Sequence, residues 1–171
     1  MTTYDPIPVP PELADEVARR RASGAFKRDE VWDGEYRMAP APRKVNALLD
    51  AEVVAVLRPL ARRAGLRVSG PFNIGGPRDH RIPDVGVHRP DTDGLWLPTA
   101  AVAVEVLSPR DPAWEKLGFY AAHEVDEVVM VDPDERTVVW LARRGDTYER
   151  VGRSTVLDVD VADVVAAIDW P

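Results

Sequence analysis

The chain has 171 residues, about the size of one domain with a stable core, and contains no cysteine, which excludes disulfides and thiolate metal sites. Its formal net charge of −7 argues against nonspecific binding to polyanions. The first residues lack the basic and apolar stretches of a signal peptide, and no run approaches the roughly 18 apolar residues of a membrane span. We therefore expect a soluble, cytoplasmic protein with no membrane partner.

The sequence pattern predicts one α/β domain over residues 1–171, because no internal repeat, linker or low-complexity block divides the chain. Pro11–Ser23 is predicted to form a first helix, which ends before Gly24. Phe26–Met38 is predicted to form a hairpin with Asp33-Gly34 as its two-residue turn. The longest helical pattern covers residues 43–65, and we expect Pro59 to kink this helix or to end it early. Its apolar stripe consists of Leu49, Val53, Val56, Leu57 and Leu60.

The second half of the chain is predicted to be mostly strand, with turn signals such as residues 73–76 between the strands. The predicted strands are Leu66–Phe72, Ile82–His88, Ala101–Leu107, Val128–Val131, Val138–Leu141 and Thr147–Val151. A helix over Pro112–Ala122 interrupts them, with Asp111 as N-cap and Trp114, Leu117 and Ala121 at core spacing. A short helix over residues 161–168 closes the chain.

Asp84 and Glu105 are the most informative residues, because each acid lies inside an apolar strand pattern. An ionised carboxylate in a dry core is costly unless it is paired or bound to a metal, so two on neighbouring strands indicate one shared cation. Mg²⁺ prefers such carboxylate oxygens and keeps several waters. Lys116 follows on a predicted helix, one turn before Tyr120, so both side chains could face the same cleft.

Other candidate constellations are weaker. His80, Asp84 and His88 would share one face of a strand, but positions four apart lie roughly 13 Å apart, too far for one zinc ion, so surface or loop histidines are favoured. Ser108 lacks the context of a nucleophile and is interpreted as a turn serine. Core or interface positions are favoured for Trp96, Trp114 and Trp140. Glu30 and Glu35 could approach the metal from the hairpin, but solvated edge charges are the preferred interpretation.

With these residues, the sequence resembles the Uma-type restriction endonuclease family of the PD-(D/E)xK nuclease superfamily. The matching segments, in chain order, are Glu30–Glu35 with Met38–Pro40, Pro83–Val85, Val104–Pro109, Lys116 with Tyr120, and Val125–Pro133. The resemblance implies a restriction-endonuclease-like mixed β-sheet flanked by helices, with Asp84 and Glu105 as metal ligands. The superfamily's basic pattern has a lysine two residues after the glutamate, where this chain has Leu107. The Uma-type family draws its lysine from the following helix, so the resemblance assigns the lysine's role to Lys116.

Two classes of function remain open. The first is an endodeoxyribonuclease that uses Mg²⁺ or Mn²⁺, with Asp84, Glu105 and Lys116 as catalytic residues and DNA as its substrate. Residues 37–89 carry a net charge of +6, which suits a phosphate backbone, although a solvated helix face gives the same charge and is the favoured explanation. The second is a catalytically degenerate nuclease fold that serves as a binding or assembly module. We also expect a homodimer, since cleavage of both strands of a duplex calls for two sites related by two-fold symmetry.

Overall fold

The computed structural model describes residues 9, 11–109 and 112–171. The α-helices are α1 (Ala14–Ser23), α2 (Lys44–Arg63), α3 (Leu117–Ala122) and α4 (Val161–Ala167), and the 3-10 helices are η1 (Pro11–Leu13), η2 (Ala25–Arg28) and η3 (Ala113–Lys116). The strands are β1 (Glu30–Trp32), β2 (Glu35–Arg37), β3 (Arg67–Ser69), β4 (Asn73–Gly76), β5 (Asp79–Arg81), β6 (Val85–His88), β7 (Trp96–Leu97), β8 (Val102–Val106), β9 (Glu127–Asp132), β10 (Thr137–Arg144), β11 (Thr147–Arg150), β12 (Arg153–Ser154) and β13 (Val159–Asp160).

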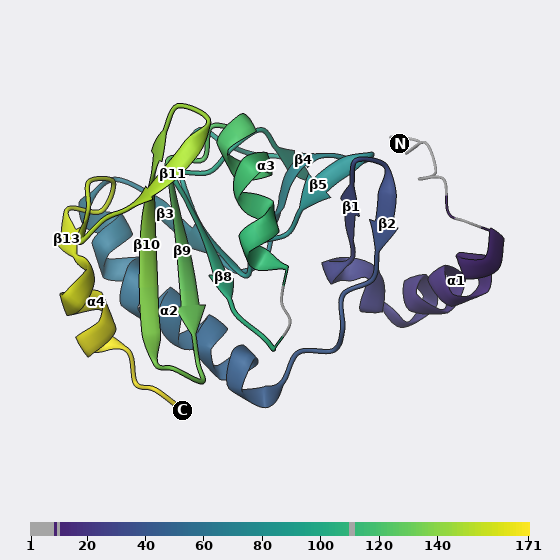
Figure 1. Ribbon diagram of the computed structural model, residues 1–171, viewed down its shortest axis with the longest axis horizontal. Helices are drawn as coiled ribbons and strands as arrows, with labels where there is room; N and C mark the ends of the chain where they lie inside the picture. Colours follow the sequence, from purple (N-terminus) through teal and green to yellow (C-terminus); the bar gives the residue numbers. More distant parts are fainter. Residues whose placement is uncertain (1–8, 10, 110–111) are drawn as a thin grey trace.

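A six-stranded mixed sheet forms the centre of the molecule, in the order β11-β10-β9-β8-β6-β3. Strands β8 and β9 are parallel, and their neighbours pair antiparallel. The parallel pair is joined through η3 and α3, which cross over one face of the sheet, as a parallel connection requires (Figure 1). β8 therefore lies in the interior of the sheet, between β9 and β6.

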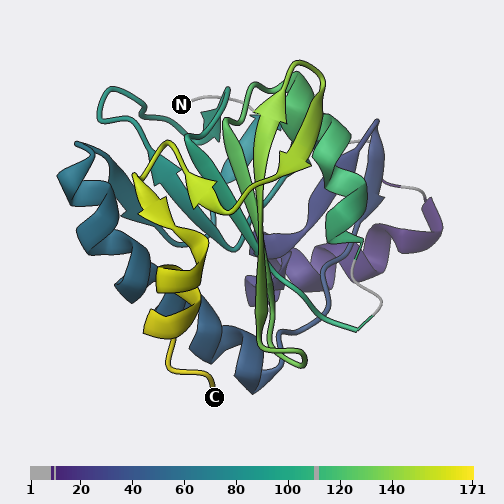
Figure 2. The same cartoon turned by 60° about the vertical axis from the view of Figure 1, so that its left-hand side comes forward.

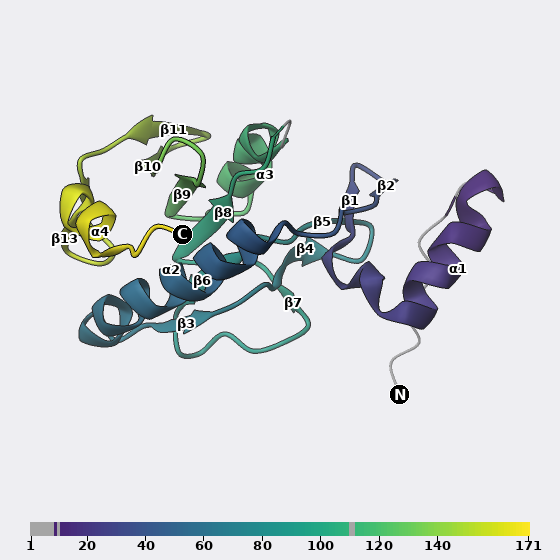
Figure 3. The ribbon, with the colours of Figure 1, turned by 90° about the horizontal axis from the view of Figure 1, so that it is seen from below.

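A second, five-stranded sheet has the order β2-β1-β5-β4-β7 and carries the N-terminal hairpin. Seen from below, the β1–β2 hairpin lies between the central part of the molecule and α1, which projects to one side (Figure 3). The hairpin turn is formed by Asp33 and Gly34, both with positive φ, as the sequence predicts. This sheet places residues from the beginning of the chain beside the end of β8.

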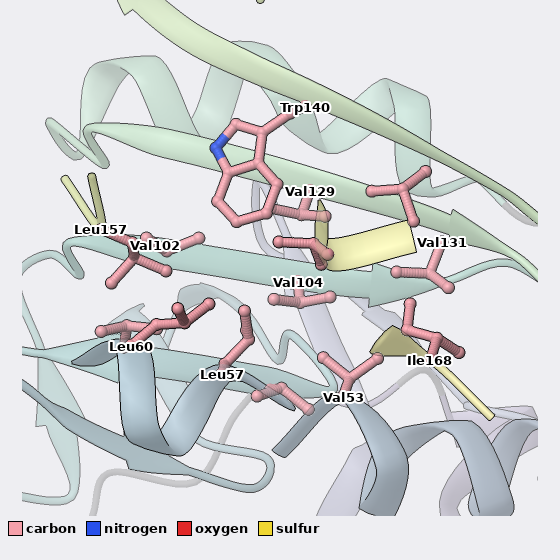
Figure 4. Close-up of a cluster of buried hydrophobic side chains, with 14 of the residues drawn as sticks. Val53, Leu57, Leu60, Val102, Val104, Val129, Val131, Trp140, Leu157 and Ile168 are labelled. Atoms are coloured by element: carbon pink, nitrogen blue, oxygen red, sulfur yellow. The ribbon is translucent and has the colours of Figure 1, made fainter. Parts of the chain in front are cut away.

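The helices cover opposite faces of the central sheet, with α2 and α4 on one side and α3 on the other (Figure 2). Successive side chains of β8 point to opposite faces of the sheet, so α2 and α3 pack against different residues of this strand. Val102, Val104 and Val106 belong to the core that packs against α2. Figure 4 shows two side chains of this helix, Val53 and Leu57, below the sheet. Ala103 faces the opposite side, in the cluster that contains Tyr120 of α3. By the same alternation, Glu105 also faces α3.

Several sequence predictions about the elements need correction. The helix around Pro59 does not end early but continues to Arg63, because its apolar stripe packs on the sheet on both sides of the proline. Residues 73–76 are not a turn: they form β4, with Ile74 fully buried in the core. Trp114 is exposed rather than at a core position. The predicted N-cap Asp111 lies outside the described residues.

Candidate active site

A cleft of about 370 Å³ opens between the hairpin, the start of α2 and the end of β8. One wall is apolar and rich in proline, and it is formed by residues 38–42. Charged side chains from several segments of the chain also line the cleft. They are Arg28, Glu30, Arg37, Asp84, Glu105 and Lys116. The predicted candidates Asp84, Glu105 and Lys116 therefore meet in one cleft.

Asp84 lies directly before β6, and its contacts hold it beside Glu105 on β8. Its backbone N–H donates to the carbonyl of Val104 at 2.9 Å, and its Oδ2 accepts from the backbone N–H of Val106 at 2.9 Å. Asp84 thus contacts both chain neighbours of Glu105, Val104 through its backbone and Val106 through its side chain. Its other oxygen, Oδ1, accepts from Arg28 Nη1 at 2.6 Å.

Glu105 is buried on the α3 face of β8, with 4% of its surface exposed. Its two carboxylate oxygens each lie 3.0 Å from Nζ of Lys116. Oε1 also accepts a hydrogen bond from the Tyr120 hydroxyl. Lys116 ends η3 and Tyr120 lies one turn later in α3, so the shared helical face predicted from their spacing is confirmed.

Glu30 completes the group, and the interpretation of this residue as a solvated edge charge is wrong. It is buried, and its Oε1 lies 2.9 Å from Lys116 Nζ and accepts from the backbone N–H of Ile82 at 2.6 Å. Its Oε2 accepts from Trp32 Nε1 at 2.7 Å. The signal in the sequence was that Glu30 begins a hairpin strand whose other residues are apolar. Glu35, at the start of the second hairpin strand, is exposed as expected.

Burial and charge act in opposite directions on the ionisable groups of the cleft. The pKa of Glu105 is raised to about 8, mainly by burial and also by the nearby Asp84 and Glu30, against the attraction of Lys116. Burial also raises the pKa of Asp84. For Lys116 burial favours the neutral amine, but the carboxylates of Glu105 and Glu30 outweigh burial and raise its pKa. Lys116 is therefore a permanently charged ammonium at neutral pH.

The cluster carries more acids than cations. Asp50 on α2 joins it through Arg28, whose Nη2 lies 3.1 Å from Asp50 Oδ2. Four carboxylates (Glu30, Asp50, Asp84 and Glu105) thus share the two cations Arg28 and Lys116. When all six groups are ionised, two negative charges remain, which is the charge that one divalent cation neutralises.

Of the other candidates considered in the sequence, Ser108 lines the cleft, whereas His80 and His88 do not. His80 and His88 are buried rather than at the surface, since β5 and β6 lie inside their sheets. His80 contacts the carbonyls of Gly76 and Asp29, and His88 contacts Ser69. Ser108 lies 3.1 Å from the side chain of Asn46, in the segment after β8.

Two of the three tryptophans considered in the sequence are buried or half-buried. Trp140 belongs to the core and Trp96 is half-buried beside His80.

In the part of the chain that the structure describes, no helix has both the length and the apolar character needed to cross a membrane.

Comparison with known proteins identifies the family and the fold of the chain. The model of the Uma2 family, described as "Putative restriction endonuclease", matches residues 14–165. Among solved structures, the chain is similar to "a putative nuclease belonging to DUF820 from Anabaena variabilis", with a TM-score of 0.65 and 17% identity over 81% of this chain and 90% of that chain. No curated protein matches the sequence. The resemblance predicted from the sequence is confirmed: the protein belongs to the Uma2 family and has a restriction-endonuclease-like fold.

Proposed function

We propose that the protein is a metal-dependent endonuclease that hydrolyses phosphodiester bonds in DNA. The observation that carries this proposal is the convergence of Asp84, Glu105 and Lys116 in one cleft, on adjacent strands and the helix that follows them. Family membership supports a nuclease, and the geometry supports these three residues as its catalytic group. In this proposal Asp84 and Glu105 hold Mg²⁺ or Mn²⁺, and Lys116 assists hydrolysis.

The donor set fits a hard cation. Within residues 9, 11–109 and 112–171, no group of three or more histidine, cysteine, aspartate or glutamate side chains is arranged so that it could hold a metal ion. Mg²⁺ does not require one, because it is commonly bound by one or two carboxylates together with waters and substrate phosphates. When all six groups are ionised, the two unbalanced negative charges of the cluster favour such a cation. No histidine is among the described residues that line the cleft, which disfavours zinc.

A bound divalent cation would supply an activated water and stabilisation of negative charge on the phosphoryl oxygens. The protein's own side chains supply two further requirements of the reaction, which are fixed positions for the reacting groups and a positive charge near the phosphate. Glu30 contacts Lys116, and Tyr120 donates a hydrogen bond to Glu105, so neighbouring side chains orient both groups in the cleft. Because Lys116 stays protonated, we assign it to charge stabilisation and to hydrogen bonding with phosphate or water, and not to proton abstraction.

Calorimetric titration with Mn²⁺ tests the assignment of the ligands. We expect the unmodified protein to bind Mn²⁺, and we expect Asp84→Asn and Glu105→Gln each to lose most of this affinity, because a neutral amide replaces an anionic ligand. Glu35→Gln is the matched control, since Glu35 is an exposed acid of the hairpin. Absence of metal binding by the unmodified protein would contradict the proposal and favour a nuclease fold that serves as a binding or assembly module.

A further inference from the structure

Arg28 lies at the mouth of the cleft and contacts acids from two different elements. Its Nη1 donates to Asp84 Oδ1 at 2.6 Å, and its Nη2 donates to Asp50 Oδ2 at 3.1 Å. Asp84 precedes β6, whereas Asp50 lies on α2, one helical turn after the cleft residue Asn46. The guanidinium therefore bridges a proposed metal ligand and an acid that the proposed mechanism does not use.

We propose that Arg28 is a counter-ion that the divalent cation displaces from Asp84, and that Asp50 is the carboxylate that retains the displaced guanidinium. The inference rests on the proposed function, because it takes Asp84 as a metal ligand. It assigns roles to Arg28 and Asp50 as positioning residues, which set the affinity of the site for its cation.

Displacement follows from the contacts of Asp84. Its Oδ2 accepts from the Val106 N–H, and its Oδ1 accepts from Arg28. A magnesium ion binds a carboxylate oxygen at about 2.0–2.1 Å. A guanidinium 2.6 Å from the same oxygen would then lie within a few ångströms of a divalent cation, where the two positive groups repel each other. Arg28 must therefore withdraw when Asp84 Oδ1 binds a metal.

Asp50 has the capacity to receive the displaced group. Its Oδ1 is buried and has no hydrogen-bond partner among the described residues, although its Oδ2 accepts from Arg28. An unpartnered buried acceptor is costly, and the planar fork of an arginine can satisfy both oxygens of a carboxylate at once. The Arg28 side chain is 35% exposed, so it has room to turn from the bridging position to a bidentate pair with Asp50.

Calorimetric Mn²⁺ titrations of Arg28→Ala, Asp50→Asn and the double variant test this inference. We expect Arg28→Ala to bind Mn²⁺ about tenfold more tightly than the unmodified protein, because the cation no longer displaces a charge-assisted hydrogen bond. We expect Asp50→Asn to weaken binding, since Arg28 then has no second carboxylate and stays on Asp84. In the Arg28→Ala background, the effect of Asp50→Asn should shrink, which a merely structural role of Asp50 does not predict.

Arg37→Ala is the matched control, because Arg37 also lines the cleft but stacks on Trp32 at 4.4 Å and pairs with the exposed Glu35. Equal tightening by Arg37→Ala would mean a general charge effect and would overturn the inference. Unchanged or weaker Mn²⁺ affinity in Arg28→Ala, with binding retained by the unmodified protein, would overturn it while the proposed function stands. If neither the unmodified protein nor Arg28→Ala binds Mn²⁺, both proposals fail.

Discussion

Lys116 is held between two buried carboxylates, with 7% of its surface exposed. Burial in an apolar environment lowers the pKa of a lysine. Here the negative charges of Glu30 and Glu105 together have the larger effect and raise the pKa of Lys116. The same contacts with Glu105 and Glu30 hold the ammonium in the cleft. This geometry suits a group that stabilises transition-state charge.

Lys116→Ala should therefore lower the rate of DNA cleavage by about 10² to 10³ while the variant still binds Mn²⁺, because we assign the lysine to water or phosphate and not to the ligands of the metal. Removal of Lys116 leaves two buried carboxylates without their partner, so thermal unfolding of the variant must be measured with Mn²⁺ present. Lys44→Ala, which removes an exposed lysine at the start of α2, is the control. Full cleavage activity of Lys116→Ala would remove the lysine from the mechanism.

At the scale of residues, the sequence predicted the acids better than their partners. Asp84 and Glu105 could be identified because a carboxylate in an apolar strand has few explanations. Arg28 and Asp50 could not, because each is an ordinary charged residue in its own helical segment, and only the tertiary fold brings them to Asp84. Glu30 was misinterpreted for a related reason: its burial depends on packing of the hairpin against η3, which lies far away in the sequence.

At the scale of elements, Asp29 connects α1 to the hairpin. It accepts hydrogen bonds from Arg20 Nε at 2.9 Å, from the Tyr36 hydroxyl at 2.5 Å and from the Ala39 N–H at 2.9 Å. Burial alone would raise the pKa of Asp29, but these hydrogen bonds outweigh burial and hold the pKa below its usual range. Asp29 thereby fixes the segment that forms the proline-rich wall of the cleft.

We expect Asp29→Asn to lower the free energy of unfolding at pH 7 by about 1.5–3 kcal/mol, the usual size of hydrogen bonds to a charged group. The pKa of Asp29 is lower in the folded protein than in the unfolded chain, where it is about 3.9. The stabilisation by ionised Asp29 is therefore complete above that unfolded value and is lost as the pH falls through the folded pKa. The difference between the two proteins should therefore shrink below about pH 4 in urea unfolding experiments.

The control for this prediction is Glu16→Gln, which removes an exposed ion pair with Arg19 on α1. It should change the free energy of unfolding little at either pH. A difference between Asp29→Asn and the unmodified protein that is constant from pH 7 to acid would contradict the ionised role of Asp29.

The long elements and several short ones were predictable from the sequence, whereas the short strands β4, β5, β7, β12 and β13 were not. The α2 stripe and the strands β8, β9 and β10 carry strong periodic patterns, and all are present. β4 was interpreted as a turn because two of its four residues are glycines. Gly75 there has positive φ, and an added Cβ would lie 2.4 Å from the carbonyl oxygen of Asp79 on the paired strand β5. Close backbone approach, and not a turn, explains this glycine.

At the scale of the whole molecule, the association state remains a prediction. Cleavage of both strands of a duplex by one site per chain calls for a two-fold symmetric pair. We therefore expect multi-angle light scattering to give twice the chain mass of 18.9 kDa at micromolar concentration. A monomer at high concentration would contradict the homodimer and would restrict the protein to nicking or single-strand cleavage.

The central claim, metal-dependent hydrolysis of DNA at Asp84 and Glu105, is tested most directly by a plasmid-cleavage assay with and without Mg²⁺ or Mn²⁺. The unmodified protein should convert supercoiled plasmid to nicked or linear DNA only when the metal is present, a chelator should stop the reaction, and Glu105→Gln should be inactive under the same conditions. Cleavage by Glu105→Gln at the unmodified rate, cleavage that persists in chelator, or intact plasmid after incubation of the metal-loaded unmodified protein would contradict the account.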